Sequence, residues 1–183
     1  MNKIAYLFLL PLVASSGKST RTSVDVTSAV PWASESTTGA ISLRPVRWTV
    51  VGGSGARNVV SGRTVPITLQ ADIAKGWHIY SLTQKGGGPI PLRLELLGAA
   101  DVIVRGVIKA PKPERTFDKN FGIETELYSG SPRFTMPVGV PGSSITGLRK
   151  FQIGARYQVC SEKVCLPPRT DKLDVAIRIS GRP

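Results

Sequence analysis

The chain has 183 residues, of which 41% are hydrophobic, 7% aromatic and 20% charged. This composition is sufficient for one soluble domain with an apolar core, and it excludes a chain that is disordered throughout. The formal net charge is +12, but the basic residues are scattered and do not alternate with stacking aromatic residues. We therefore expect a basic solvated surface, open to attraction by anionic envelope lipids or an acidic partner, and not a nucleic-acid site.

The N-terminus has the features of a secretory signal. Lys3 precedes the apolar run 4–14, and the small residues 15–17 follow. Such a run is too short for a bilayer, which takes about 20 residues, and the pattern predicts a signal peptide over 1–16 that is cleaved after Ser16. A short buried strand or helix is the alternative. We expect the mature chain to be periplasmic or otherwise exported, without a transmembrane span, where disulfides persist.

The rest of the chain is predicted to be a tether followed by one folded domain. Residues 17–40 are rich in Ser, Thr, Ala and Gly and have no sustained periodicity, which is typical of a flexible tether. The domain is expected to occupy residues 41–183. Apolar and polar residues alternate there over 46–50, 64–73, 92–96, 134–140, 151–159 and 173–179. Several short strands with one buried face each, separated by Gly/Pro turns, predict an all-β antiparallel sandwich.

The two cysteines of the chain, Cys160 and Cys165, form a candidate redox pair. An extended strand would hold their Cα atoms about 17 Å apart, at about 3.3 Å per residue, whereas a disulfide needs about 4.4–6.8 Å. Pairing therefore requires a turn, with residues 161–163 as the hairpin tip and the prolines at 167–168 ending the return strand. So short a loop stabilises by only about 2 kcal/mol, as expected of a bond that is made and broken. A passive staple in an exported protein is the alternative.

The alternation also predicts the direction of the first cysteine. The strand over 151–159 buries its odd positions, and Cys160 shares the phase of Arg156 and Gln158 on the exposed side. A purely structural cysteine more often points inward, so this position favours a reactive role. The spacing is not C-x-x-C, and two cysteines alone make a weak metal site. No motif indicates a cofactor, so we expect neither metal nor cofactor.

Four further side chains are candidates for the surroundings of the cysteine pair. His78 and Tyr80 would share one face of a strand, where they either line the cysteine site or lie at a sheet edge. The long polar stretch 110–123 carries Phe117 and Phe121. These two rings either form a lid over a reactive group or anchor the loop on a small satellite core.

The segment from Cys160 to Pro168, with the sequence Cys-Ser-Glu-Lys-Val-Cys-Leu-Pro-Pro, resembles the active-site hairpin of a known family. That family is the N-terminal periplasmic domain of DsbD, the transmembrane disulfide-interchange reductase. Segments 76–80, 121–128 and 134–138 resemble it in the same order. The resemblance covers about residues 45–180 and implies an immunoglobulin-like sandwich.

The resemblance also implies a redox shuttle. Cys165 would form the mixed disulfide and Cys160 would resolve it, while Phe121, with Phe117 as the second match, would shield the pair. The partners implied are thioredoxin-like periplasmic proteins and, because no transmembrane domain follows in this sequence, a membrane-embedded reductant on a separate chain. His78 stands where the family often has Tyr, so the resemblance implies no role for it. The competing hypothesis is an immunoglobulin-like module that binds a protein or glycan and has a structural disulfide.

Overall fold

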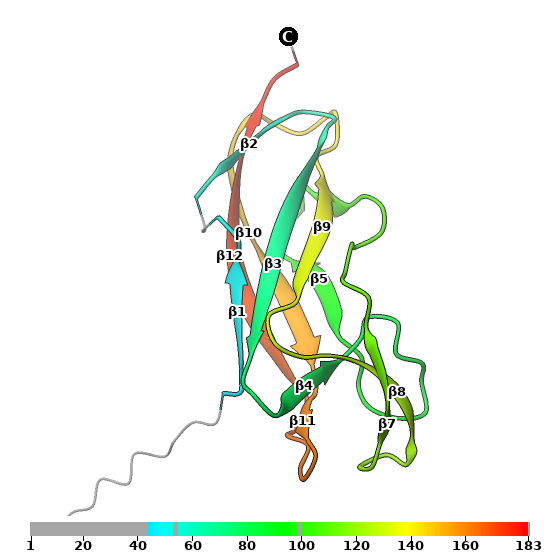
Figure 1. The fold of residues 1–183 in the computed structure, drawn as a ribbon. Helices are drawn as coiled ribbons and strands as arrows, with labels where there is room; N and C mark the ends of the chain where they lie inside the picture. Colours follow the sequence, from blue (N-terminus) through cyan, green and yellow to red (C-terminus); the bar gives the residue numbers. More distant parts are fainter. Residues whose placement is uncertain (1–43, 53–54, 99, 183) are drawn as a thin grey trace, which may run out of the picture. The chain divides into compact units, whose positions relative to one another are not determined.

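The computed structural model describes residues 44–52, 55–98 and 100–182. The predicted signal peptide over 1–16 and tether over 17–40 lie outside the described residues. Within the described part, the regular structure consists of strands alone (Figure 1), which confirms the all-β fold class. No helix that is long and apolar enough to cross a membrane occurs among these residues.

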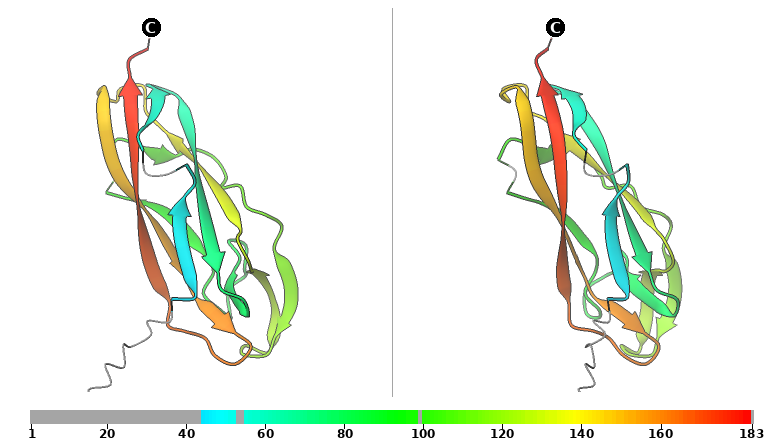
Figure 2. Two further views of the ribbon diagram at one scale, coloured as in Figure 1. Left: turned by 60° about the vertical axis from the view of Figure 1, so that its left-hand side comes forward. Right: turned by 90° about the vertical axis from the view of Figure 1, so that its left-hand side faces the viewer.

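Two four-stranded sheets form the body of the domain. The first has the order β1-β3-β9-β6 and consists of β1 (Val46–Val50), β3 (Thr64–Ile73), β9 (Arg133–Gly139) and β6 (Ile103–Val104). The second has the order β2-β12-β10-β5 and consists of β2 (Arg57–Val60), β12 (Arg169–Ser180), β10 (Gly147–Tyr157) and β5 (Arg93–Leu97). Figure 2 shows the two sheets face to face. Their pairings are antiparallel, except that β2 runs parallel to β12.

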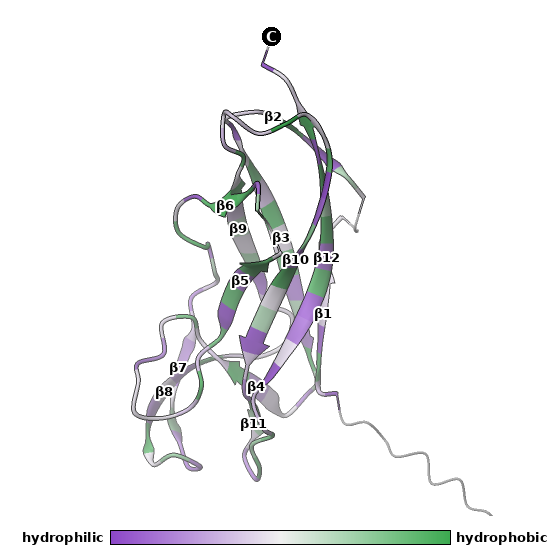
Figure 3. Ribbon diagram, turned by 180° about the vertical axis from the view of Figure 1, so that it is seen from behind, coloured by the Kyte–Doolittle hydropathy of each residue, from purple (hydrophilic) through white to green (hydrophobic). Residues whose placement is uncertain are grey.

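The core lies between these two sheets and is built from one face of each. Ile67 and Leu69 of β3, Ile153 of β10 and Ile177 of β12 are all 0% exposed and belong to one apolar cluster. Hydrophilic and hydrophobic residues succeed each other along the long strands β10 and β12 (Figure 3). The six alternating segments correspond to β1, β3, β5, β9, β10 with β11, and β12, so the sequence prediction of a two-faced sandwich is confirmed.

A third sheet, which we call the end sheet, lies at one end of the body (Figure 1). Its order is β11-β4-β8-β7, with β11 (Val159–Ser161), β4 (Trp77–Tyr80), β8 (Ile123–Tyr128) and β7 (Glu114–Asp118). β4 follows β3 after a tight turn in which the Trp77 N–H donates to the Ala74 carbonyl at 3.0 Å. Gly76 in this turn has a φ of +81°, a conformation that glycine adopts without steric cost.

The longest strand pairing of the body leads directly into the end sheet. β10 and β12 stay paired as far as Tyr157. Gln158 belongs to neither β10 nor β11, and its side-chain Oε1 accepts a hydrogen bond from the Ile90 backbone N–H at 3.1 Å. The odd positions stay buried through Val159, at 1% exposed, but Cys160 on the opposite face is buried too, at 0% exposed, because both faces of β11 are covered. The prediction that Cys160 lies on the exposed face is therefore wrong.

Three strands were not predicted from the sequence: β2, β6 and β7. β7 lies in the stretch 110–123, which was expected to be a long polar loop. Four of its five residues are exposed, so it has no hydrophobic alternation. Only its antiparallel pairing with β8, from Glu114 opposite Leu127 to Asp118 opposite Ile123, defines it as a strand.

Candidate functional site

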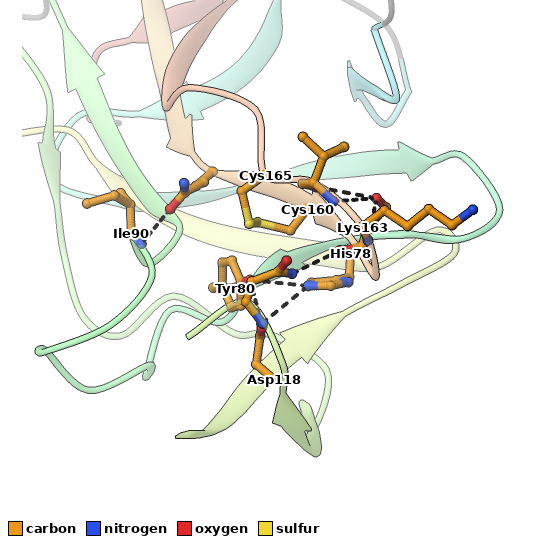
Figure 4. The surroundings of a disulfide bond; sticks show 11 residues. His78, Tyr80, Ile90, Asp118, Cys160, Lys163 and Cys165 are labelled. Atoms are coloured by element: carbon orange, nitrogen blue, oxygen red, sulfur yellow. Dashed lines mark hydrogen bonds and ion pairs between the residues drawn. A yellow bond between two sulfur atoms is a disulfide. The ribbon is translucent and has the colours of Figure 1, made fainter. Parts of the chain in front are cut away.

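Cys160 and Cys165 form a disulfide across a short hairpin at the edge of the end sheet (Figure 4). The Ser161 N–H donates to the Val164 carbonyl at 2.8 Å, and the Leu166 N–H donates to the Val159 carbonyl at 2.9 Å. These two bonds bracket the cysteines, which are therefore opposed as a non-hydrogen-bonded pair, where Cα atoms approach to about 4.5 Å. Their Cα atoms are 4.0 Å apart and the S–S bond is 2.04 Å long.

The tip of the hairpin is closed by one serine. The Ser161 Oγ accepts hydrogen bonds from the backbone N–H groups of Lys163 and Val164, each at 3.2 Å. A serine hydroxyl that bonds its own turn in this way fixes the reversal of the chain. The turn lies where the sequence analysis expected it. It brings together two sulfur atoms that an extended strand would keep apart.

The two cysteines differ in exposure. Cys160 is 0% exposed, whereas Cys165 is half-buried. The neighbours of Cys165 at the outer edge are more open, since Val164 is 47% exposed and the prolines at 167–168 are exposed. Cys165 is therefore the more accessible of the two cysteines to a second thiol, while Cys160 is fully buried.

His78 lies directly across the sheet from Cys160. β11 pairs with β4, and Cys160 is the ladder partner of His78. Residues that are opposed in a ladder have their side chains on the same face, and so have residues two apart on one strand. His78 and Tyr80 thus share the face of the disulfide, and the His78 Nε2 lies 3.3 Å from the Tyr80 hydroxyl. Figure 4 shows both rings beside the disulfide hairpin.

A buried carboxylate, Asp118, completes this group. The Tyr80 hydroxyl donates to the Asp118 Oδ2 at 2.6 Å, and the His78 Nε2 lies 3.8 Å from the same oxygen. Asp118 is 5% exposed. The sequence analysis missed this residue, because Tyr80 and Asp118 are 38 positions apart. The sequence offered one indication of such a residue: a buried tyrosine hydroxyl needs a hydrogen-bond acceptor.

Burial shifts the protonation of both rings. It raises the pKa of Tyr80 far above its ordinary value, and the hydrogen bond to Asp118 and the negative charge of that carboxylate raise it further. Burial lowers the pKa of His78, and the nearby carboxylates of Asp118 and Glu114 oppose this effect only in part. At neutral pH Tyr80 is therefore a neutral hydrogen-bond donor and His78 is an uncharged imidazole.

The turn between β7 and β8 packs beside these groups. The Asp118 Oδ1 accepts a hydrogen bond from the Asn120 N–H at 2.8 Å, and the Asp118 backbone carbonyl accepts one from the Gly122 N–H at 2.7 Å. Phe121 of this turn is half-buried and meets the Tyr80 ring edge-on, with ring centroids 5.9 Å apart. Phe117, the other candidate ring, is 62% exposed and takes part in no such contact within the described residues.

One side-chain hydrogen bond links this turn to the disulfide hairpin. The Asn120 Nδ2 donates to the Ser161 carbonyl at 3.0 Å. Asn120 is exposed, so this bond competes with water and is weak. The sequence analysis did not single out Asn120, because its role depends on the distance between two loops.

A hollow of about 380 Å³ adjoins the site and is lined by Trp77, His78, Glu114, Asp118, Asn120 and Glu162, among others. Its wall mixes polar and apolar surface, and Ser161 and Glu162 of the hairpin form part of it. Within residues 44–52, 55–98 and 100–182, no group of three or more His, Cys, Asp or Glu side chains is arranged to hold a metal ion.

These features define a class of protein: an immunoglobulin-like antiparallel sandwich that has a disulfide in an edge hairpin. The model of the family described as "Thiol:disulfide interchange protein DsbD, N-terminal" matches residues 53–177. The chain therefore belongs to this family, and the resemblance stated from the sequence is confirmed. The activity of the family is thiol–disulfide exchange.

Solved structures with a similar fold are distant. The reduced DsbD N-terminal domain from Neisseria meningitidis is 20% identical, with 64% of this chain and 82% of that chain covered and a TM-score of 0.45. The N-terminal periplasmic domain of ScsB from Proteus mirabilis is also 20% identical, with 71% and 44% covered and a TM-score of 0.46. A complex of DsbD and PilB N-terminal domains from Neisseria meningitidis gives 19% identity, 60% and 73% covered and a TM-score of 0.42. No curated protein sequence matches the chain.

Proposed function

We propose that this chain is an exported thiol–disulfide oxidoreductase that passes reducing equivalents between thioredoxin-like proteins through a reversible Cys160–Cys165 disulfide. One observation carries the proposal. In a family of thiol–disulfide interchange domains, the cysteine pair lies in an edge hairpin with one buried and one accessible sulfur. Three parts of this proposal follow from family membership. They are the thioredoxin-like partners, a membrane-embedded reductant as the source of electrons, and the periplasmic location.

The difference in exposure assigns a role to each sulfur. A partner thiolate attacks the Sγ of Cys165, the Cys160–Cys165 bond breaks, and its electron pair leaves on the Sγ of Cys160. A mixed disulfide between Cys165 and the partner results. A second thiolate of the partner then attacks the partner sulfur of this bond and releases Cys165 as a thiolate. The partner dithiol is oxidised to a disulfide and Cys160 and Cys165 become a dithiol; the reverse sequence reduces the next partner.

His78, Tyr80 and Asp118 have a positioning role in this proposal. The Tyr80–Asp118 bond of 2.6 Å fixes the ring against which Phe121 packs. His78 lies opposite Cys160 on the neighbouring strand and is held by the same tyrosine and carboxylate.

The turn at 118–122 acts as a cap in this proposal. Phe121 packs on Tyr80, and the Asn120 side chain holds the turn to the hairpin backbone through one exposed hydrogen bond. Such a bond contributes about 0.5–1.5 kcal/mol at most. A docking partner can therefore break it at small cost, whereas a small oxidant gains nothing by doing so.

The reduction potential of the cysteine pair tests the proposal. We expect the purified chain, equilibrated in graded thiol buffers, to have a potential of about −180 to −270 mV, the range of thioredoxin-like exchange proteins. A potential below about −300 mV is typical of structural disulfides and would contradict the proposal in favour of a binding module.

Trapping tests the two roles. A Cys160→Ala variant lacks the resolving thiol, so the mixed disulfide that its Cys165 thiolate forms by attack on the disulfide of an oxidised thioredoxin-like protein should accumulate. Cys165→Ala serves as the matched control and should accumulate none. The opposite pattern would reverse the roles of the two sulfur atoms.

A further inference from the structure

The end of the body that lies opposite the disulfide forms a surface that we call the far tip. It consists of three turns, at 61–63, 140–146 and 180–182. Figure 1 shows β2 and the C-terminal end of β12 at this end of the domain and β11 at the other. The Ser61 N–H donates to the Ser180 carbonyl at 2.9 Å. The Gly62 N–H donates to the Val140 carbonyl at 3.0 Å, so backbone hydrogen bonds join the three turns into one surface.

Three arginine residues of the far tip lie around Gly62. Arg63 follows it in the turn, and the Arg105 Nη1 donates to the Gly62 carbonyl at 3.5 Å. A Cβ at Gly62 would lie 2.9 Å from the Arg182 Nη2, so the glycine leaves room for this guanidinium. All three arginines are exposed, and none of them forms an ion pair within the described residues. Their positive charges are therefore free to meet an anionic partner.

The charge of the domain is distributed unevenly between its two ends. The three turns of the far tip contain no acidic residue. Asp101 lies beside them, since the Ser144 Oγ donates to its carbonyl at 3.4 Å, but its carboxylate is paired with Arg149 at 2.9 Å. The segments of the end sheet and its turns hold five basic and five acidic residues, over 77–85, 111–129 and 158–168. Positive charge is thus in excess at the far tip and balanced around the disulfide.

A large apolar side chain is exposed on the same surface. Ile145 lies in the turn 140–146 and is 75% exposed. The Ser61 Oγ donates to the Gly142 carbonyl at 3.0 Å, which joins this turn to the one with the arginines. Apolar side chains beside basic ones are typical of surfaces that bind a membrane, where the apolar group enters the interface and the cations meet anionic lipids. An acidic protein would account for the arginines alone.

We propose that the far tip docks on an anionic phospholipid surface, with Ile145 in the headgroup region and Arg63, Arg105 and Arg182 on lipid phosphates. The planar fork of a guanidinium suits a phosphate group, which it can bind through two parallel hydrogen bonds. This inference goes beyond the proposed exchange function and does not depend on it. Docking at the far tip leaves the disulfide hairpin, at the other end of the domain, open to thioredoxin-like proteins.

Co-sedimentation with lipid vesicles tests the inference on the chain purified after export. One set of vesicles contains phosphatidylcholine alone, and the other includes about one third phosphatidylglycerol, which is anionic. We expect the chain to bind the second set only, and to bind it more weakly at high salt, because salt screens the attraction. Equal binding to both sets, or binding to neither, would overturn the inference.

Two triple variants of equal net charge test whether the far tip is the site. The substitutions of the tip variant are Arg63→Gln, Arg105→Gln and Arg182→Gln. Those of the control variant are Arg93→Gln, Arg156→Gln and Lys172→Gln, at exposed positions outside the far tip. We expect the tip variant to bind the anionic vesicles about a hundredfold more weakly than the control, at about fivefold for each arginine near the surface. Equal binding of the two variants would show a response to net charge alone and would overturn the inference.

A second pair of variants tests the apolar contact and does not depend on the triple variants. Val107 is 85% exposed and lies in the segment 105–109, which runs beside residues 135–137 of β9 and away from the far tip. We expect Ile145→Ser to bind the anionic vesicles about fivefold more weakly than the control Val107→Ser, because only Ile145 leaves water on docking. Equal binding of these two variants would overturn docking on lipid and favour an acidic protein as the partner of the arginines.

Discussion

The body of the domain and its end sheet are built on different principles. The body has an apolar core in which residues from both sheets are fully buried. The end sheet holds the buried polar groups: of the four buried polar residues among those described, Ser81, Asp118 and Thr125 lie in or beside it, and only Ser61 lies elsewhere. Stability thus comes mainly from the body, whereas the Cys160–Cys165 disulfide lies in the end sheet, where breaking it costs little stability.

Two similar hydrogen bonds show the difference in detail. In the end sheet, the Tyr80 hydroxyl donates to Asp118 at 2.6 Å. At the end of β10 in the body, the Tyr157 hydroxyl donates to Asp171 at 2.7 Å. Asp171 also receives two hydrogen bonds from Arg169, at 2.6 and 3.0 Å. Among the described residues, no arginine or lysine forms an ion pair with Asp118, and the His78 Nε2 lies 3.8 Å from its Oδ2.

The largest effect is expected at the accessible sulfur. Replacement Cys165→Ser should abolish exchange with thioredoxin-like proteins, because the other cysteine, Cys160, is 0% exposed. The loss of the disulfide should lower the free energy of unfolding by only about 2 kcal/mol. Insulin-reduction or partner-reduction assays, together with thermal unfolding, measure both. Residual turnover in Cys165→Ser would show that Cys160 exchanges directly.

The next largest effect is expected from a substitution in the apolar core of the body. Replacement Ile67→Ala leaves a cavity in the core and should cost about 2–5 kcal/mol of stability, with a fall in Tm of about 2–4 °C per kcal/mol. The reduction potential should stay unchanged, since the end sheet is untouched. Val164→Ala in the exposed hairpin is the control and should change stability by at most about 0.5 kcal/mol. A shift in potential with Ile67→Ala would contradict this separation of the two regions.

The paired tyrosines sharpen the comparison. Tyr80→Phe leaves the Asp118 Oδ2 without its hydroxyl donor, while Oδ1 keeps the Asn120 N–H. The change should cost about 1–3 kcal/mol and alter the exchange rate, because Phe121 loses its fixed neighbour. Tyr157→Phe should cost less, because Arg169 still satisfies Asp171, and the exchange rate should not change. Chemical denaturation and exchange kinetics of both variants measure these effects. Equal costs would show that the two carboxylates have equivalent surroundings.

A smaller effect is expected at the cap. Asn120→Ala removes the hydrogen bond between the 118–122 turn and the hairpin, so oxidation of the reduced pair by a small disulfide should accelerate about two- to fivefold. Asn58 on β2 is exposed and distant from the hairpin in the chain, and Asn58→Ala is the control. An unchanged rate in Asn120→Ala would show that the turn does not limit access.

The smallest effect is a pH dependence from the single histidine. Burial lowers the pKa of His78 below its ordinary value of 6.5. As the pH falls below that value, the unfolded chain binds a proton before the folded chain does, so stability decreases on acidification and is fully present above it. Denaturation of the wild type and of His78→Gln between about pH 5 and pH 8 measures the difference. A wild-type stability that rises on acidification relative to His78→Gln would contradict it.

The sequence predicted the body better than the end sheet for a physical reason. Strands such as β3 pack one face on the core, so their hydrophobic alternation is visible in the sequence and predicts the strand and its buried face. β7 has solvent on most of its surface, and its pairing with β8 is invisible in its composition. The hairpin tip at 161–163 could be predicted because the two cysteines could pair only through a turn. The burial of Cys160 could not, because it depends on what covers its face of the end sheet, where Tyr80 is also 0% exposed.

The partners within the site were also hidden from sequence. Asp118 and Asn120 act through contacts with Tyr80 and Ser161, residues that lie far from them along the chain. The resemblance to a known family supplied the cysteine hairpin and Phe121 as candidates, but it had no match that would single out an amide at position 120. Contacts between loops follow from the register of the end sheet, and that register becomes visible only when the strands are assembled.

The continuous pairing of β10 with β12 has a kinetic consequence for the open form of the disulfide. The chain enters the hairpin from Tyr157 and leaves it at Arg169, and these two residues are the last ladder partners of the body. When the S–S bond is cut, both ends of the segment between them stay fixed side by side. The two thiols are therefore held at high effective concentration and can close again without a search through open conformations. In the proposed exchange, the body would in this way limit how long a mixed disulfide survives and how fast a partner is released.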